Sequence, residues 1–382
     1  MSEAVNHVFN VALVGLSFGA EFIPIYQSHR STNLLALCQR TKEKLDALAD
    51  AWNVPKRYTD YDELLSDDEI EIVHINTPPE THADFCVKAL EAGKHAACTI
   101  PMALSVKDCQ RIVEAQEKSG KQYMMMETAV YTREFLYCRE KHLRGDFGKL
   151  QFFRSSHQQD MSGWPKYWEG FPPMWNATHA ISPTLALNRD QAATVTCFGS
   201  GTIQNHMHGN YGSPFAIEST HIRFKDSDLV AEVTRSLFDT ARQYRESFDV
   251  YGSKESFEWT MIENEPHILH VGEIPSRIDP PDYAHLLPEE IQKFTRAGVY
   301  DADEHQHLSF IQGGGHGGSH PHLVNEFISA LLENGSPTQM RVRPQISPAR
   351  ESSPTKARFR AAKQFRCRIG HLFSPQAERE II

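Results

Sequence analysis

The sequence lacks any apolar stretch long enough to cross a membrane, because no segment approaches roughly 18 uninterrupted apolar residues. It also begins without the basic segment and apolar run that make up a secretory signal. Its seven cysteines are scattered and include no Cys-x-x-Cys pair, which argues against a disulfide framework and against a zinc knuckle. We therefore expect a cytoplasmic protein with free thiols and no membrane partner.

Positive charge is scarce in most of the chain, which has a formal net charge of −10. The basic excess is confined to residues 339–382, where ten Lys and Arg face three Asp and Glu. An acidic body of this kind is not expected to bind nucleic acid. With 382 residues and 40% hydrophobic content, the chain is long enough for two domains with sizeable cores.

The stretch 11–20, VALVGLSFGA, is typical of a buried strand that enters a tight turn of small residues and then a helix. Against the dinucleotide motif Gly-x-Gly-x-x-Gly, Ser17 and Ala20 replace the second and third glycines. Gly15 would make the sharp turn, and small Ser17 would let the backbone approach a pyrophosphate. Ala20 would allow close packing of a helix whose first amides face the phosphates. An ordinary strand-to-helix turn is the alternative.

Strands and helices alternate through residues 1–126, which we interpret as a dinucleotide-binding Rossmann domain. The apolar runs predict strands at 33–38, 70–75, 94–98 and 122–126, and helices at 20–29, 41–51, 80–92 and 105–118. This alternation predicts a doubly wound parallel sheet in an α/β fold. Ligands bind at the carboxyl ends of such strands, so one rim is expected to hold Gly15, Ser17, Phe18, Gly19, Ala20, Gln39, Asn76, Thr77, Pro78, Thr99 and Pro101.

The end of the second strand bears on the choice of cofactor. A dinucleotide fold usually places a carboxylate there to hold the adenosine ribose. This chain has Gln39 and Arg40 instead, so nothing repels a 2′-phosphate and Arg40 can pair with one. We expect NAD or NADP, with a solvent-facing Arg40 as the alternative to a phosphate contact.

The succession of motifs resembles the Gfo/Idh/MocA family, the glucose-fructose oxidoreductase and inositol dehydrogenase group of NAD(P)-dependent enzymes. The matching stretches are VALVGLSFGAEF at 11–22, VHINTPPETHADFCVKALEAGKHAAC at 73–98, and Pro101 with the helix after it. The resemblance covers roughly residues 8 to 335. It implies a second domain with a large, mostly antiparallel sheet, a sugar or polyol substrate, and a place for Asn76, Thr77, Pro78 and His82 along the nicotinamide.

The chain departs from this family at two proton-handling positions. Family dehydrogenases carry Glu-Lys-Pro where this chain has Thr99-Ile100-Pro101, and Ile100 cannot pass a proton. The family also places an aspartate four residues before a histidine in the substrate domain. Here the histidine corresponds to His179, while Trp175 occupies the aspartate position.

The second domain is expected over 127–337, with a helix at 132–144 and strands at 147–156, 193–201, 215–224, 229–237 and 247–252. We predict that the later strands form an antiparallel meander, and that a helix follows at 323–332. A loop rich in aromatic residues spans 158–183, where the tryptophans either stack on a sugar or pack on the sheet. The expected substrate residues are Trp164, Trp168, Trp175, Asn176 and His316. The open face of the large sheet leads us to expect a homo-oligomer.

Some motifs resemble the NAD-dependent glycosidase branch of the family. Residues 176–180, NATHA, are similar to its Tyr-Pro-Thr-His-Gly loop, and 315–318 reads Gly-His-Gly-Gly. Glu127 and Tyr131 match a Glu with a Tyr four residues on, although Asn176 replaces the branch's loop tyrosine. The expected catalytic residues are His179, Glu127, Tyr131 and His157. We expect no metal at His316, His320 and His322, because Glu326 is the one carboxylate nearby in sequence.

Three reactions remain open from the sequence. In a dehydrogenase, nicotinamide takes a hydride from a sugar carbon while His179 removes the hydroxyl proton. In a redox-neutral glycosidase or lyase, a base such as Glu127 or His157 then promotes elimination of the glycosidic group, and the hydride returns. The third possibility is a cofactor-binding sensor without catalysis.

The segment 338–382 shows no steady helical or strand period. Its composition changes abruptly after the apolar run 327–332. A basic tail that binds an acidic partner is one interpretation. We favour a shift of reading frame that has replaced the original C-terminus.

Overall fold

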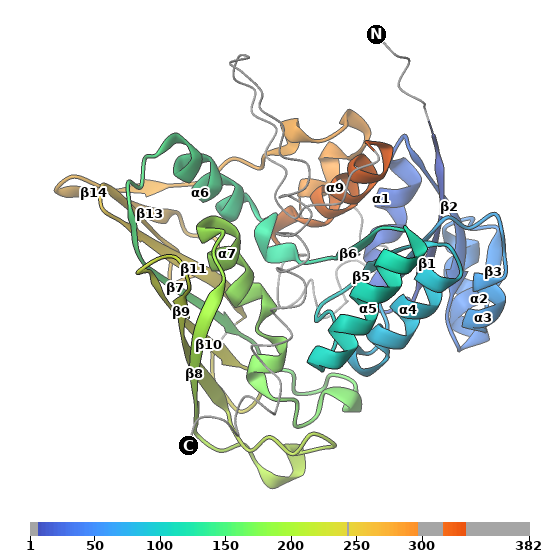
Figure 1. Cartoon of the computed structure of the whole chain (residues 1–382), viewed down its shortest axis with the longest axis horizontal. Helices are drawn as coiled ribbons and strands as arrows, with labels where there is room; N and C mark the ends of the chain where they lie inside the picture. The colour runs from blue at the N-terminus through green and yellow to red at the C-terminus, as the bar shows by residue number, and fades with distance from the viewer. Residues whose placement is uncertain (1–6, 243, 297–315, 334–382) are drawn as a thin grey trace. The chain divides into compact units, whose positions relative to one another are not determined.

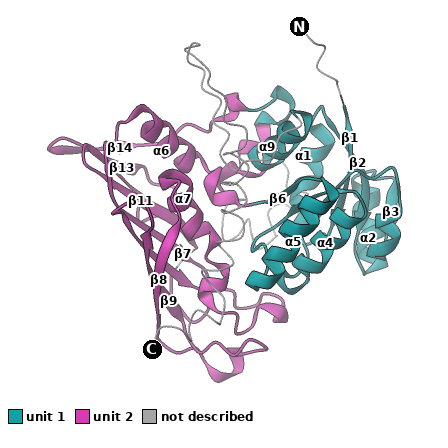
Figure 2. Ribbon diagram, in the orientation of Figure 1, with its two compact units in different colours: residues 1–126, 287–292, 321–382 teal, residues 127–286, 293–320 magenta. Residues whose placement is uncertain are grey.

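The computed structural model describes residues 7–242, 244–296 and 316–333 of the chain. It divides into two compact units, which Figure 2 colours separately. Unit 1 comprises Met1–Met126, Leu287–Gln292 and Pro321–Ile382, and unit 2 comprises Glu127–Leu286 and Lys293–His320. The described residues after His320, which are 321–333, therefore group with unit 1, although we assigned residues up to 337 to the second domain. Within the described ranges, no helix is long and apolar enough to cross a membrane.

Unit 1 is built on a parallel sheet of six strands in the order β3-β2-β1-β4-β5-β6. The strands are β1 (Phe9–Val14), β2 (Thr32–Cys38), β3 (Lys56–Tyr58), β4 (Ile72–Ile75), β5 (His95–Cys98) and β6 (Tyr123–Met125). The helices are η1 (Gly19–Phe22), α1 (Ile23–Ser28), α2 (Lys42–Ala51), α3 (Tyr61–Leu65), η2 (Pro79–Thr81), α4 (His82–Glu91), α5 (Val106–Ser119) and α9 (His320–Leu332). This arrangement confirms the predicted doubly wound sheet, and α4 and α5 lie side by side along it (Figure 1).

Local sequence signals explain where the helices of unit 1 begin and end. The Ser105 hydroxyl caps α5 by accepting a hydrogen bond from the backbone amide of Asp108 at 3.1 Å. Gly120 ends the same helix in the left-handed conformation, at φ 68°. We did not predict β3 and α3, because three-residue and five-residue elements are too short to show a period.

The helix expected at 20–29 is divided into two pieces. Residues 19–22 form a 3₁₀ turn, and α1 begins at Ile23 with Pro24 in its first turn. Proline has no amide hydrogen and its ring clashes with the preceding turn, so it costs little in the first turn of a helix but about 3 kcal/mol in the interior. The predicted helix, with Pro24 in its first turn, is therefore confirmed over Ile23–Ser28, whereas residues 20–22 belong to the 3₁₀ turn.

Unit 2 is built on an eight-stranded sheet in the order β14-β13-β12-β11-β7-β10-β9-β8. The strands are β7 (Leu150–Gln158), β8 (Ala192–Ser200), β9 (Ile217–Phe224), β10 (Val230–Ser236), β11 (Arg245–Gly252), β12 (Glu255–Glu258), β13 (His267–Val271) and β14 (Ile274–Ile278). The α-helices are α6 (Arg133–Arg144) and α7 (Thr178–Asn188). The 3₁₀ turns are η3 (Thr128–Val130), η4 (Lys166–Trp168), η5 (Pro173–Asn176), η6 (Asn205–Met207), η7 (Ala284–Leu286), η8 (Glu289–Thr295, shared with unit 1) and η9 (His316–Gly318).

The large sheet is mostly antiparallel, as predicted, but it is not a simple meander. Strand β7 lies between β10 and β11 and runs parallel to β10. Consecutive β10 and β11 are therefore not neighbours. The prediction failed because pairing between strands that are far apart in sequence leaves no local signal.

The loop expected at 158–183 ends at residue 177, although Pro183 led us to extend it further. Helix α7 begins at Thr178 and contains Pro183 in its interior. Every residue from Thr178 to Leu187 is buried, and the helix packs across β7, β10 and β11. Burial of almost the whole helix surface outweighs the cost of about 3 kcal/mol of an interior proline. The tail at 338–382 and the glycines of 311–315 lie outside the described residues.

Candidate functional site

Strand register places three ionisable side chains in one row across the sheet of unit 2. In the β7–β10 pair, His157 lies opposite Arg235, and in the β7–β11 pair it lies opposite Glu246. Paired residues on adjacent strands project from the same face of a sheet. The row Arg235, His157, Glu246 therefore follows from the unexpected insertion of β7 between β10 and β11.

Two further elements bring His179 and Glu127 to this row. His179 lies in the first turn of α7, and Glu127 directly precedes η3. The Nδ1 atom of His179 lies 2.5 Å from Oε1 of Glu127 and 3.3 Å from the hydroxyl of Thr128. The same carboxylate oxygen accepts the backbone amide of Ala129 at 3.0 Å, and the Glu127 side chain is fully buried.

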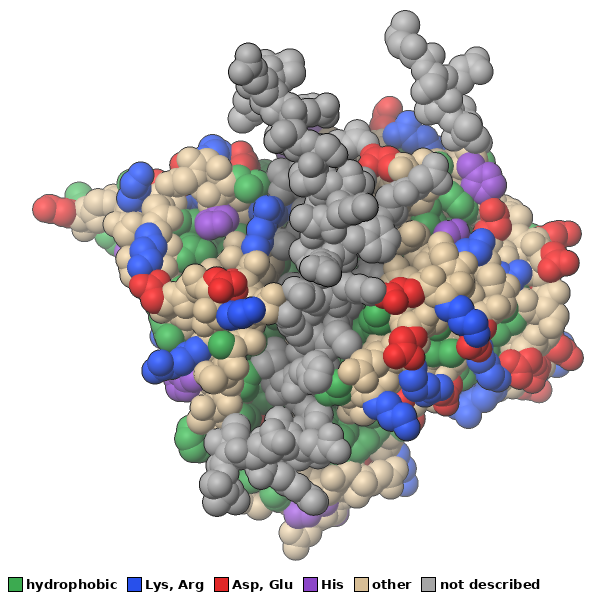
Figure 3. Space-filling view, viewed as in Figure 1, with side chains coloured by type: hydrophobic (Ala, Val, Ile, Leu, Met, Phe, Trp, Pro, Cys, Tyr) green, Lys and Arg blue, Asp and Glu red, His purple; other side chains and the backbone are tan. Residues whose placement is uncertain are grey.

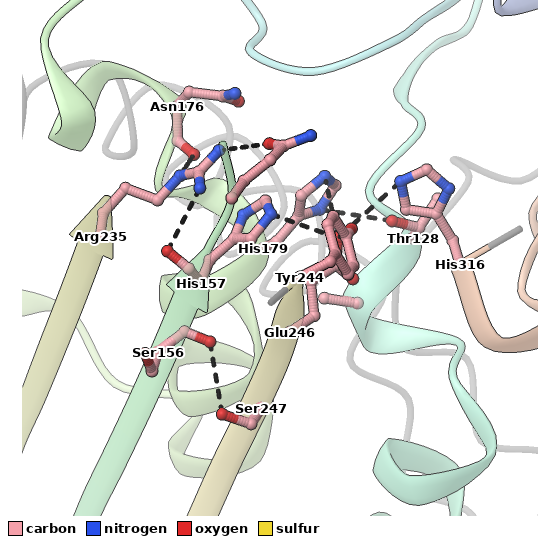
Figure 4. Close-up of polar contacts among 12 residues, drawn as sticks. Thr128, Ser156, His157, Asn176, His179, Arg235, Tyr244, Glu246, Ser247 and His316 are labelled. Carbon is pink, nitrogen blue, oxygen red and sulfur yellow. Dashed lines mark hydrogen bonds and ion pairs between the residues drawn. The ribbon is translucent and has the colours of Figure 1, made fainter. Parts of the chain in front are cut away.

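The Oε1 atom of Glu246 is the point on which the cluster converges (Figure 4). The Nε2 atoms of His157 and His179 each lie 3.7 Å from it, and Nε2 of His316 lies 3.8 Å away. The Tyr244 hydroxyl donates a hydrogen bond to the same oxygen. The sequence-predicted residues His157, His179, Glu127 and His316 are thus brought together within unit 2.

The charges of the cluster are set by burial and by its two carboxylates. Burial opposes a charge on His179, but Glu127 and Glu246 outweigh it and raise the pKa of His179 to about 9. Burial, reinforced by Arg235, holds the pKa of His157 well below its usual range. Burial would raise the pKa of Glu246, yet His179 and His316 bring it below its ordinary value. At neutral pH, therefore, His179 carries a proton and His157 is neutral.

Arg235 supports the cluster from the interior of the sheet. Its guanidinium is fully buried and donates to the carbonyl oxygens of Asn176, His157 and Ser236 and to Oε1 of Gln159, at 2.6–3.2 Å. Burial lowers the pKa of Arg235 to about 9, which still leaves it charged at neutral pH. The residue fixes η5 to β7 and places a positive charge beside Glu246.

Four residues of the cluster were not predicted from the sequence: Glu246, Tyr244, Arg235 and Thr128. We started the strand of β11 at Ser247, one residue after Glu246, because a charged residue does not extend an apolar run. A signal was present, since Arg235 and Glu246 each lie within a run of alternating strand residues that otherwise has an apolar face. Tyr131 is buried directly after η3, and its catalytic role stays a prediction.

Unit 1 carries a candidate site of its own, for a dinucleotide, at the carboxyl edge of its sheet. Backbone hydrogen bonds link consecutive strand ends there, including Gly15 N to Cys38 O at 3.0 Å and Asn76 N to Val14 O at 2.7 Å. Thr99 N donates to Ile75 O in the same way at 3.0 Å. The strand ends that we expected to share a rim therefore do share it.

The glycine turn fits a dinucleotide because its backbone is packed too closely for side chains. Gly15 has φ +83°, and a Cβ atom there would lie 2.4 Å from the backbone oxygen of Asn76. A Cβ on Gly19 would lie 2.9 Å from Nδ2 of Asn76. The Asn76 side chain also keeps a buried Oδ1 without a hydrogen-bond partner among the described residues. An exposed Ser17 and an exposed Arg40 flank this turn and the end of β2.

His82 is buried and links two loops. It is not the exposed histidine that would follow an ordinary proline-rich strand end. Its side chain is fully buried, with Nδ1 2.7 Å from the carbonyl oxygen of Pro101 and Nε2 2.7 Å from that of Thr77. Both ring nitrogens are used, so His82 joins the loops that follow β4 and β5. Gln39, Phe18, Ala20, Pro78 and Thr99 are partly exposed at or near the same edge of the sheet.

The aromatic side chains of 164–175 pack on one another around Phe171. The ring centroids of Trp168 and Trp175 lie 5.2 and 5.7 Å from that of Phe171, and Trp164 contacts Trp168 at 6.3 Å. Each tryptophan is half-buried, whereas Phe171 is 1% exposed. One side of the tryptophan cluster is thus occupied by packing, and a sugar contact on the other side stays a prediction.

Charges of both signs are interspersed on the face of unit 1 that carries α4 and α5 (Figure 3). Ion pairs link Lys88 to Asp62 at 2.7 Å and Arg111 to Asp84 at 2.7 Å. A nucleic-acid site needs basic side chains gathered in a stripe or patch, and this face is mixed.

Comparison with known proteins finds a family model and several relatives that are similar to parts of this chain. Residues 9–127 match the model of the oxidoreductase family GFO_IDH_MocA, NAD-binding Rossmann fold. A "Glycosyl hydrolase family 109 protein" of Shewanella baltica is 28% identical over 234 residues, which are 53% of this chain and 50% of that protein. An "Alpha-N-acetylgalactosaminidase" of Shewanella oneidensis is 27% identical over 198 residues, 46% of this chain and 42% of that protein. The chain thus spans about half the length of the curated relatives it matches.

A solved structure shares the fold over nearly the whole chain. It is a levoglucosan dehydrogenase in complex with NADH and levoglucosan, with a TM-score of 0.70, 17% identity and coverage of 98% of both chains. The fold, the glycine turn and the family match agree. Residues 9–127 are therefore similar to the NAD-binding Rossmann domain of the Gfo/Idh/MocA oxidoreductases.

Proposed function

We propose that this protein oxidises a hydroxyl group of a carbohydrate, with His179 handling the hydroxyl proton and NAD or NADP as the redox partner. The observation that carries the proposal is the 2.5 Å contact between His179 and Glu127, both buried, in a chain with an NAD-binding Rossmann domain. The levoglucosan dehydrogenase with the same fold gives a precedent for a sugar substrate.

The bound nicotinamide supplies the hydride acceptor for such an oxidation. The carboxyl edge of unit 1 would hold it, with the backbone of Gly15 and Gly19 against the pyrophosphate and the loop at Asn76 beside the nicotinamide. Exposed Arg40 has no carboxylate beside it in sequence, so we propose that a 2′-phosphate is tolerated.

His179 is suited to move a proton because Glu127 fixes its ring. The carboxylate holds Nδ1, so Nε2 is the atom that faces Glu246 and the remaining imidazoles. Once deprotonated, an imidazole with a pKa of about 9 is a strong acceptor for a hydroxyl proton. When it carries the proton, the same atom is a donor to a leaving oxygen. Ile100 leaves the lysine position of the family without a proton carrier, which gives His179 this task alone.

The second candidate function is a redox-neutral glycosidase or lyase, which the names of the Shewanella relatives favour. That reaction needs a second base, for the C–H bond next to the transient carbonyl. Glu127 is committed to His179 and to the amide of Ala129, so His157 is the better choice. His157 is neutral, and neither ring nitrogen has a hydrogen-bond partner among the described residues.

One experiment separates these candidates. The protein is incubated with NAD⁺ or NADP⁺ and with free sugars or glycosides, in deuterated water. A dehydrogenase accumulates reduced nicotinamide in amounts equal to the oxidised sugar. A redox-neutral enzyme releases the aglycone without net reduction and places deuterium on the carbon next to the transient carbonyl. Cofactor binding without either result on a broad sugar panel would refute the catalytic proposal and indicate a sensor.

A further inference from the structure

The side chains around Glu246 have the composition of a metal shell. One ring nitrogen of His157, one ring nitrogen of His179 and a carboxylate oxygen of Glu246 all lie within 4.8 Å of one another. Two imidazole nitrogens and one carboxylate oxygen form a donor set typical of zinc and its neighbours in the first transition row. We propose that His157, His179 and Glu246 bind one divalent transition-metal ion, with zinc or cobalt as the fitting class.

The separations within the cluster suit an ion better than direct hydrogen bonds. Both histidine Nε2 atoms lie 3.7 Å from Oε1 of Glu246, beyond the roughly 3.2 Å limit of an N–H···O hydrogen bond. Ligands about 2.0–2.1 Å from a tetrahedral ion lie about 3.3–3.4 Å apart. A contraction of a few tenths of an ångström would therefore bring each histidine to ligand distance from the Glu246 oxygen, and the two imidazoles, which lie within 4.8 Å of each other, must also draw together. Nε2 of His316, 3.8 Å from the same oxygen, is within reach as a further ligand.

The surroundings of His179 have the second feature expected of a metal ligand. A ligating histidine usually donates its other ring nitrogen to a carboxylate, which orients the ring and leaves the lone pair for the ion. Glu127 holds Nδ1 of His179 at 2.5 Å and is itself fixed by the amide of Ala129. Nε2 of His179 is therefore directed toward Glu246.

His157 gives an independent indication that a ligand binds at this position. Its side chain is 3% exposed, and neither Nδ1 nor Nε2 has a hydrogen-bond partner among the described residues. A buried polar atom without a partner is costly, so such atoms normally face water or an ion. The register of β7 and β11 directs this ring to the same side of the sheet as Glu246.

The site goes beyond the proposed function and can be tested without it. Nε2 of His179 cannot hold an ion and accept a substrate proton at the same time. We therefore expect the ion-loaded protein to bind NAD as before and to lose any turnover that depends on His179. Metal binding itself is measured without cofactor or sugar.

The test is a titration of the chelator-treated full chain with Zn²⁺ by calorimetry, and with Co²⁺ by visible absorption. The wild type is expected to bind one ion per chain at this site. His157→Gln and Glu246→Gln are expected to weaken that binding by more than about 100-fold, and Glu127→Gln by about 10–100-fold, as is usual for an outer partner. His267→Gln is the matched control, since His267 is a buried histidine of unit 2 with a single carboxylate, Glu134, at 3.4 Å. Thermal unfolding of each variant verifies its fold.

The outcomes separate this inference from the proposed function. Binding that is lost in His157→Gln and Glu246→Gln but kept in His267→Gln supports the site, even if no sugar is turned over. Absence of binding to the wild type overturns it, even if sugar oxidation proceeds. Equal affinity in all variants also overturns it, because the ion would then be held by other histidines or cysteines of the chain.

Discussion

His179 is the residue on which both proposed reactions depend, and Glu127 determines which of its nitrogens is available. Replacement of His179 by Ala is expected to lower turnover about 10²–10⁴-fold, because a positioned acid or base contributes that much. Glu127→Gln keeps an acceptor for Nδ1 but removes the charge, so a smaller loss is expected. Steady-state rates are compared with His267→Gln, which should match the wild type. Unchanged turnover in His179→Ala would contradict both mechanisms.

Replacement of Gly15 by alanine tests the glycine turn by adding one methyl group. Gly15→Ala places Cβ 2.4 Å from the Asn76 carbonyl oxygen, so the rim must move and affinity for NAD should fall sharply. Gly120→Ala is the matched control, since Gly120 also has positive φ, at +68°, but no atom lies within 4 Å of the added carbon. Gly120→Ala should lower the free energy of unfolding by only about 1–2 kcal/mol, which is the cost of the left-handed conformation for alanine.

Calorimetric NAD titration and urea unfolding of the Gly15→Ala and Gly120→Ala variants measure this difference. If the two variants keep equal affinity for NAD, then the close approach at Asn76 is irrelevant to the cofactor. The prediction concerns the dinucleotide site alone and does not depend on the sugar reaction.

At the scale of elements, Arg235 joins β10, β7 and η5 through buried hydrogen bonds. Arg235→Met would leave the carbonyl oxygens of Asn176, His157 and Ser236 without this donor, at about 1–3 kcal/mol for each group left unsatisfied. We expect the free energy of unfolding in urea to fall by more than about 3 kcal/mol. The control is Lys149→Met, directly before β7 of the same sheet, whose pair with Asp228 is exposed on both sides and should contribute about 0–1 kcal/mol. Equal losses would contradict this account.

The elements that could be predicted from sequence are those whose burial is uniform or periodic. β1 and β4 are continuous apolar runs, and α5 has a capping serine and a terminal glycine, so all three were found within one or two residues. Short β12, β13 and β14 were missed. His179, His316 and Glu127 could be singled out because they lie in motifs that resemble the NAD-dependent glycosidase branch. Glu246 could not, because its importance arises from the pairing of β7 with β11.

At the scale of the whole molecule, acid should weaken the fold through His95 on β5. Nδ1 of His95 accepts the backbone amide of Gln122 at 3.0 Å, and burial lowers the pKa of His95 to about 4. Between its unfolded value of about 6.5 and about 4, the unfolded chain binds a proton that the folded chain does not. This contribution to stability is complete above about pH 6.5 and decreases as the pH falls, by up to about 1.4 kcal/mol per pH unit.

Urea unfolding of wild type and His95→Gln at about pH 7 and about pH 4.5 checks the sign. The variant lacks the titrating ring, so the stability gap between the two proteins should narrow in acid. A constant gap would show that His95 titrates alike in both states.

The position of β7 between β10 and β11 also has a consequence for how the chain folds during synthesis. The parallel sheet of unit 1 has all six of its strands once Met125 has been made, but β7, at Leu150–Gln158, must wait for partners at Val230–Ser236 and Arg245–Gly252. Contacts of such sequence separation form slowly, and a strand with both edges open is prone to aggregate. We therefore expect nascent chains that end before Gly252 to require chaperones. Until β11 has been made, one edge of β7, the strand that carries His157, has no partner strand.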